Sequence, residues 1–187
     1  MALPDYLAEE IHTLVWSGFY DRDEVLEIVC EQDDEVDESE AAGLIDAEVA
    51  AKHAAEREWE DETDCDRLDR VFAWLNENGI IALQNAGMTQ SDGLEDVTEI
   101  YDGLGRDGSG VVGYCFYHGQ DLARAVAGTG LYLTFGDIEG TDEKGVEIGR
   151  MIRSALANEH FEVTWNGRID TRILVPRIEW KKRWTDV

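Results

Sequence analysis

Cysteine and proline are both scarce in this chain, which has three cysteines and two prolines among 187 residues. Cys30, Cys65 and Cys115 are an odd number at wide spacings, so they form neither a disulfide framework nor a zinc-binding pattern. No apolar run approaches the roughly 18 residues that span a bilayer, and the N-terminus lacks the basic region of a signal peptide. We therefore expect a soluble cytoplasmic protein with no membrane partner, bound metal or cofactor.

Basic residues are also few. The chain has 16 Lys and Arg residues against 42 Asp and Glu residues, which gives a net charge of −26. A field of this sign repels phosphate backbones, so direct binding to nucleic acid is excluded. The charge is uneven, because residues 1–64 hold 22 acidic and 3 basic residues. Most of the acidity therefore belongs to the first third of the chain.

Apolar residues, by contrast, are abundant enough for a core. Hydrophobic residues make up 43% of the chain and include six tryptophans, which excludes a disordered polypeptide. The length suits one domain with a smaller appendage. We divide the chain into an acidic helical segment over residues 1–62 and an α/β sandwich domain over residues 63–187.

The apolar residues of the first segment recur with helical spacing. One stripe ends at Gly18, a suitable C-terminal cap, and Asp21 predicts the start of a second helix. Seven of the ten residues in 31–40 are acidic, so we expect a solvated loop there. A third helix is predicted over 41–60. The first stripe consists of Leu7, Ile11, Leu14 and Val15.

From Thr63 onward, helical patterns alternate with short β-rich runs, which is typical of helices packed on a sheet. After a helix that begins near Thr63, further helices are predicted to begin at Ser91 or Asp92, at Gln120 and at Asp142. The predicted strands are Ile80–Leu83, Val111–Tyr117, Leu131–Phe135, Phe161–Trp165 and Thr171–Trp180.

This order of elements predicts an α+β fold. The strand-helix-strand units joined by a short helical link favour a ferredoxin-like split βαβ sandwich with an extra C-terminal strand. A doubly wound α/β sheet is the alternative, because the short helix near Gln120 is also a suitable crossover. Pro176 indicates that the last strand lies at an edge of the sheet.

Two polar loops are the candidate functional regions. The first follows the strand Ile80–Leu83, and its candidate ligand-binding residues are Asn85, Gln90, Ser91 and Asp92. A loop between a strand and a helix N-terminus is a frequent place for small ligands, because free backbone N–H groups there favour anions. Helix capping by Thr89, Ser91 and Asp92 is the simpler interpretation of this loop.

The second loop follows the strand Val111–Tyr117 and contains His118, Gln120 and Asp121. His118 and Asp121 are candidates for a hydrogen-bonded acid/base pair, with Cys115 as a nearby nucleophile and Gln120 as a binding residue. The alternative is structural, with Asp121 capping a helix and Cys115 buried in the core. If the two strands run parallel and are adjacent or separated by one strand, both loops meet at one sheet edge and form a single site.

Other motifs add little. Gly103, Gly105 and Gly108 match the letters of a dinucleotide fingerprint, but they follow a helix and precede a strand, the reverse of what that site needs.

The basic stretch from Arg168 to Arg183 is predicted either to protect an edge strand or to dock against the acidic helices.

The Asn85–Gly93 loop, the turn from Phe116 to Asp121, the segment 130–136 and the closing Trp165–Trp180 hairpin together resemble an uncharacterised bacterial domain family. The resemblance covers most of the chain. It implies no activity.

Three interpretations of function follow. The first is a non-enzymatic interaction or regulatory protein whose acidity attracts a basic protein partner. The second is a small-molecule enzyme or binding protein that uses the loops around Asn85 and His118. In the third, four lysines against twelve arginines and abundant carboxylates reflect a salt-adapted host, and the charge identifies no partner.

Overall fold

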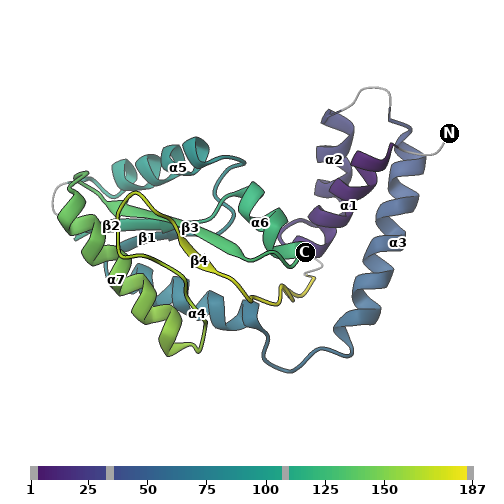
Figure 1. The fold of residues 1–187 in the computed structure, drawn as a ribbon. Helices are drawn as coiled ribbons and strands as arrows, with labels where there is room; N and C mark the ends of the chain where they lie inside the picture. Colours follow the sequence, from purple (N-terminus) through teal and green to yellow (C-terminus); the bar gives the residue numbers. More distant parts are fainter. Residues whose placement is uncertain (1–3, 33–35, 107–109, 185–187) are drawn as a thin grey trace. The chain divides into compact units, whose positions relative to one another are not determined.

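A computed structural model describes residues 4–32, 36–106 and 110–184 of the chain (Figure 1). It is a mixed α+β structure that divides into two compact units. The helical unit consists of the described residues of Met1–Thr63 and Trp180–Val187, and the mixed unit is Asp64–Glu179. Residues 180–184 thus belong to the helical unit, although the sequence division placed them in the 63–187 domain.

The helical unit contains α1 (Asp5–Ser17), α2 (Arg22–Gln32) and α3 (Glu38–Glu56). The stripe predicted in α1 is buried in the core of this unit, and Gly18 ends the helix with a φ of 74°. Asp21 Oδ1 accepts the amide of Glu24 at 2.9 Å, so the predicted start of α2 is confirmed. No helix in the described ranges carries an apolar stretch long enough to cross a bilayer.

The acidic residues 31–40 are less irregular than predicted. Helix α2 continues to Gln32, and α3 already begins at Glu38, where Asp37 caps it by accepting the amide of Glu40 at 3.0 Å. Acidic side chains in a first helical turn are favoured by the helix dipole, which explains why part of this stretch is ordered. Residues 33–35 of the predicted loop lie outside the described residues.

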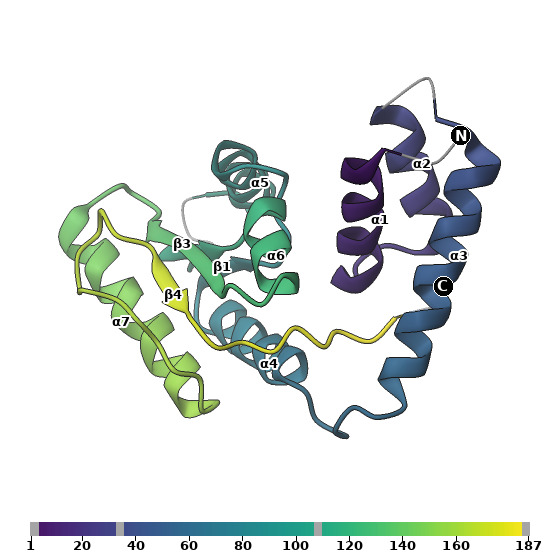
Figure 2. The same ribbon diagram turned by 45° about the vertical axis from the view of Figure 1, so that its right-hand side comes forward.

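Residues 180–184 form a strap that completes the helical unit (Figure 2). Trp180 donates from Nε1 to the carbonyl of Ser17 at 3.0 Å, near the C-terminus of α1. Lys181 pairs with Glu60 at 3.0 Å, and Trp184 packs against the core of the unit. Residues Lys181 to Arg183 of the basic stretch therefore contact the acidic helical unit.

The mixed unit contains one four-stranded sheet in the order β1-β2-β3-β4 within the described ranges. Strands β1 and β2 are parallel, and β3 is antiparallel to both β2 and β4. Its strands are β1 (Ile80–Leu83), β2 (Gly113–Phe116), β3 (Leu131–Asp137) and β4 (Ile173–Val175). Its helices are α4 (Asp64–Glu77), α5 (Gln90–Gly103), α6 (Gly119–Val126) and α7 (Asp142–Asn158).

The α+β class is confirmed, but the ferredoxin-like arrangement is not. A split βαβ unit needs another strand between its two parallel strands, whereas β1 and β2 are direct neighbours. The doubly wound alternative also differs, because the two pairings made by β3 are antiparallel. Both predictions used the order of elements along the chain, which does not determine the order of strands in a sheet.

The predicted C-terminal strand pair is much shorter than expected. In the described chain, Phe161–Trp165 contributes only a bridge between Thr164 and Leu174, and β4 ends just before Pro176. Proline has no N–H to donate, so it stops the ladder at this point. Strand β4 does lie at a sheet edge, as Pro176 indicated.

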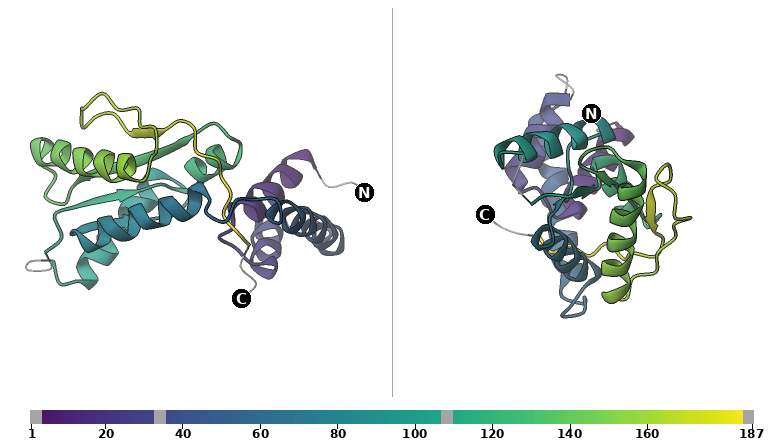
Figure 3. Two further views of the ribbon diagram at one scale, coloured as in Figure 1. Left: turned by 90° about the horizontal axis from the view of Figure 1, so that it is seen from below. Right: turned by 90° about the vertical axis from the view of Figure 1, so that its left-hand side faces the viewer.

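Helices cover both faces of the sheet. Helices α4 and α7 lie side by side on one face, which Figure 3 shows from below, and α5 and α6 pack on the other. Side chains alternate between these layers: Tyr117 meets Phe72 of α4, whereas Phe116 packs in the α5 layer. This second layer, on the side of α5 and α6, contains the candidate site.

The packing of α5 on β2 depends on Gly93. A Cβ at this position would lie 2.4 Å from Cε2 of Phe116, closer than any real carbon contact. Phe116 is fully buried, so its ring has little freedom to move. Gly93 therefore lets α5 approach the sheet closely enough to bring Gln90, at its N-terminus, beside the strands.

We predict that Gly93→Ala destabilises the mixed unit by about 1–3 kcal/mol through overpacking against Phe116. Gly103→Ala is the matched control, because Gly103 lies in the same helix and has no atom within 4 Å of an added Cβ. Urea denaturation measures both free energies of unfolding. Equal stability of the two variants would contradict this account of the helix-sheet contact.

Candidate functional site

The two predicted loops meet at the carboxyl ends of β1 and β2. Backbone hydrogen bonds join them, from the amide of Ala86 to the carbonyl of Tyr117 (2.9 Å) and from the amide of Gly119 to the carbonyl of Gly87 (2.9 Å). The parallel pairing of neighbouring strands, which the single-site hypothesis required, is therefore present.

Several backbone amides in these loops are nevertheless occupied. Asp92 Oδ2 accepts the amides of Thr89 (2.8 Å) and Met88 (3.0 Å), while Thr89 Oγ1 accepts the amide of Asp92 in return. The amides of Gly119 and Gln120 donate to loop carbonyls. These amides are thus taken up within the loops themselves and are not available to an anion. Thr89 is the N-cap of α5, and Asp92 completes its capping box.

Asp121 is the centre of a buried polar cluster. Its Oδ2 accepts from Nε2 of His118 at 3.0 Å and from Nη2 of Arg172, which approaches from the segment before β4. Arg172 also donates to the carbonyl of Tyr132 at 3.3 Å, and its guanidinium lies 5.3 Å from the centre of the Tyr132 ring. The exposed fractions of the His118 and Asp121 residues are only 4% and 1%.

The protonation state of His118 follows from this arrangement. A carboxylate only accepts hydrogen bonds, so the Nε2 that faces Asp121 carries the ring proton. Burial lowers the pKa of His118, and Arg172 lowers it further, against opposing effects of Asp121 and Asp92. The neutral ring therefore presents Nδ1 as an acceptor. Nδ1 faces the amide of Asp121, but that amide donates to the His118 carbonyl (2.9 Å), and Nδ1 has no hydrogen-bond partner.

Two adjoining hollows lie beside this cluster, and we call them together the groove. The His118 hollow, of about 630 Å³, is lined by His118, Gln120, Asp121, Arg124, Tyr132 and Thr171. The Thr134 hollow, of about 430 Å³, includes Tyr114, Thr134, Gly136, Asp137 and Asp142. Gln90, Asp170 and Arg172 line both.

Unpaired buried polar atoms are concentrated in residues that line the groove. In the described chain, three buried side-chain nitrogen or oxygen atoms have no hydrogen-bond partner: Nδ1 of His118, Oγ1 of Thr134 and Nε of Arg172. All three residues line the groove. Such atoms are rare in native proteins because each one costs desolvation free energy.

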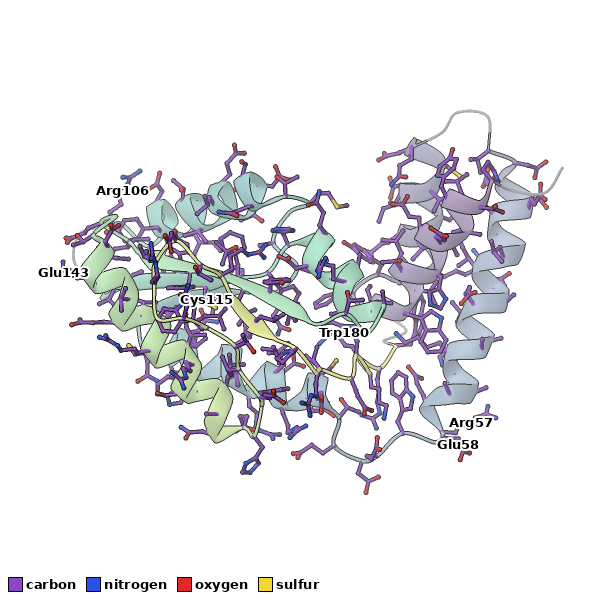
Figure 4. The ribbon with its side chains drawn as sticks, in the orientation of Figure 1. Arg57, Glu58, Arg106, Cys115, Glu143 and Trp180 are labelled. Carbon is purple, nitrogen blue, oxygen red and sulfur yellow. The ribbon has the colours of Figure 1, made fainter. Side chains whose placement is uncertain are left out.

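The structure brings together only some of the predicted site residues. Gln90 and Gln120 line the groove with His118 and Asp121. Asn85, Ser91 and Asp92 do not line either hollow, and Asp92 serves as a helix cap. Cys115 is fully buried in the sheet (Figure 4), and desolvation raises the pKa of its thiol strongly, so it is a core residue and not an accessible nucleophile.

Sequence reasoning missed Thr134, Arg124, Tyr132 and Arg172. Thr134 stands in a strand predicted only for its apolar residues, and Arg172 was assigned to a basic edge strand. Arg172 is 51 positions from Asp121, so no local spacing connects them. Among the described residues, no three His, Cys, Asp or Glu side chains are grouped in a way that suits a metal ion.

We predict that acidification destabilises the mixed unit through His118. Its pKa in the folded chain is below the roughly 6.5 of an unfolded histidine, so the unfolded chain takes up this proton at higher pH. The free energy of unfolding should therefore fall as the pH drops through about 6.5. The measurement is the hydrogen-exchange protection of β2 and β3 at about pH 7.5 and at about pH 5.5. Protection should fall between these two pH values by less in His118→Asn than in the unmodified chain.

His160→Asn is the matched control. His160 is exposed in the same unit and has a φ of 66°, a conformation that asparagine tolerates. If His160→Asn removes as much of the pH dependence as His118→Asn, the assignment to His118 is wrong.

Comparison with protein-family models matches residues 2–184 to DUF6891, a domain of unknown function. This confirms the resemblance to an uncharacterised family. No curated protein and no solved structure matches the chain.

Proposed function

The chain belongs to the DUF6891 family, whose function is unknown, and we propose that it binds a small polar molecule in the groove. The observation that carries this proposal is the location of the three unpaired buried polar atoms. His118 Nδ1, Thr134 Oγ1 and Arg172 Nε all belong to residues that line the groove. A ligand that hydrogen-bonds to them removes a cost that the free protein carries.

The magnitude of that cost supports a ligand. An unsatisfied buried donor or acceptor destabilises a protein by about 1–3 kcal/mol. Three of them in residues around one groove amount to a large fraction of the roughly 5–15 kcal/mol that stabilises a folded chain. At a core position with no binding role, an apolar side chain of the same shape avoids this cost. Polar side chains that remain unpaired therefore favour a binding role.

Each unpaired atom has a defined role in such binding. Nδ1 of His118 accepts a ligand hydrogen bond, because Asp121 fixes the ring proton on Nε2. Nε of Arg172 donates to a ligand oxygen, while its Nη2 stays on Asp121. The Thr134 hydroxyl can do either. The groove therefore suits a ligand that carries both donors and acceptors.

We predict that Thr134→Val stabilises the free protein by about 1 kcal/mol and weakens ligand binding, because it removes an unpaired buried hydroxyl. Urea denaturation measures the stability. Binding is measured by thermal shift and calorimetry with a panel of small polar molecules, comprising amino acids, sugars, nucleosides and carboxylic acids.

Thr98→Val is the matched control for this substitution. The hydroxyl of Thr98 donates to the carbonyl of Leu94 at 2.8 Å and lies outside the groove, so we expect no gain in stability and unchanged binding. A panel in which nothing binds, or in which Thr134→Val binds as tightly as the unmodified chain, would contradict the proposed function.

We also propose that the helical unit binds a basic protein. Asp23, Glu27 and Glu31 are exposed at four-residue intervals along α2, so they form one acidic stripe. A stripe of this kind, within a chain of net charge −26, accelerates association with a basic surface. The exposure and periodicity of these carboxylates support this second function independently of the groove.

Carboxamide substitution of Asp23, Glu27 and Glu31 is predicted to reduce capture of basic proteins from a cell lysate at low salt. The same substitution of Glu77, Glu95 and Glu99, which are exposed on the mixed unit, is the control with equal loss of charge. Equal loss of capture in both variants would show that only net charge matters. Capture that persists at about 0.5 M salt would contradict an electrostatic stripe.

A further inference from the structure

We propose that the ligand of the groove is a small zwitterion, an amino acid or a short unblocked peptide, with its ammonium group in the Thr134 hollow and its carboxylate in the His118 hollow. This inference rests on the proposed binding function. It is carried by the carboxylates of the Thr134 hollow, by the two arginines of the His118 hollow, and by the unpaired polar atoms Thr134 Oγ1 and Arg172 Nε.

The Thr134 hollow is acidic. Asp137 and Asp142 line it, and Asp137 is 7% exposed although the chain elsewhere keeps most carboxylates in water. Oδ2 of Asp137 accepts the amide of Thr141 at 3.0 Å. Thr134, 5% exposed, adds its unpaired hydroxyl to the same hollow. Carboxylates and a hydroxyl are acceptors for the three N–H groups of an ammonium ion.

In the His118 hollow both carboxylates, Asp121 and Asp170, are already paired with arginines. The guanidinium groups of Arg124 and Arg172 both lie over the ring of Tyr132, at 5.1 Å and 5.3 Å from its centre. Asp121 engages Nη2 of Arg172, but Nε of Arg172 is unpaired. Two arginines held on one aromatic ring, one of them with an unpaired Nε–H group, suit a ligand carboxylate.

One ligand can reach both ends. Gln90, Asp170 and Arg172 line both hollows, so the two are continuous. Asp170 is already paired with Arg168 at 2.7 Å, which leaves Asp137 and Asp142 as the charges for the ammonium group. The volumes of about 430 and about 630 Å³ are within the usual range for small-ligand sites and admit more than a single amino acid.

The net charge of the protein also favours a zwitterion. A field from −26 charges opposes the approach of a simple anion to the two arginines. A zwitterion has no net charge, so it approaches without this opposition and still presents a carboxylate locally.

The test begins with calorimetric titration of the full chain with free L-α-amino acids and with unmodified dipeptides. Each compound that binds is then titrated in its N-acetylated and its C-amidated form. We expect each modification to lower the affinity at least tenfold, because each removes one of the two ligand charges. The comparison of amino acids with dipeptides decides the length of the ligand.

Two exposed residues assign the charges to the hollows. Asp142→Asn should weaken binding of the free compound but leave binding of its N-acetylated form unchanged. Arg124→Gln should weaken binding of the free compound but leave binding of its C-amidated form unchanged. Glu143→Gln is the control for the first, since Glu143 follows Asp142 on α7 and points outward (Figure 4). Arg57→Gln, an exposed arginine of the helical unit, is the control for the second (Figure 4).

The outcomes separate this inference from the proposed function. If sugars, nucleosides or simple carboxylic acids bind and depend on Thr134, while zwitterions do not bind, the groove is a binding site and the zwitterion inference is overturned. If zwitterions bind but the blocked forms bind equally well, it is also overturned. If none of these compounds binds, the proposed function itself fails.

Discussion

The candidate site depends on the pairing of the buried Asp121 carboxylate with His118 and Arg172. One oxygen, Oδ2, accepts from the His118 ring and from the Arg172 guanidinium, and the amide of His118 is 3.4 Å away. A charge this deeply buried is costly unless it is paired, so the three groups hold one another in place. Through them the end of β2, the start of α6 and the segment before β4 converge on one point. The orientation of the His118 ring and the position of Arg172 over Tyr132 both follow from this convergence.

Local features of this chain were readable from the sequence because their causes are local. The buried stripe of α1 and the capping of α2 by Asp21 depend on residues within one or two helical turns. The pairing of His118 with Asp121 has the same origin, since the two residues are three positions apart in one turn. The meeting of the two loops was predicted only on the condition that β1 and β2 run parallel, and the structure supplies that pairing.

The rest depends on interactions between distant segments. The order of the strands is set by pairing, and the same series of helices and strands is compatible with several orders. Arg172 reaches Asp121 across 51 positions, and its role was hidden among the other basic residues of the C-terminal region. Free amides at the helix N-termini were expected, but whether a neighbouring loop occupies them depends on the folded backbone. Thr134 is a further example, because the sequence does not tell whether the hydroxyl of a threonine in a strand has a hydrogen-bond partner.

The strap of residues 180–184 has a consequence for the order of events during synthesis. The helices of the first unit leave the ribosome early, but Trp184 and the Trp180 contact with Ser17 are supplied by residues translated after the whole mixed unit. The first unit to be made is therefore the last to be completed. Until then its apolar faces remain partly uncovered, and the high density of carboxylates on its outer surface keeps such an intermediate apart from other nascent chains by mutual repulsion.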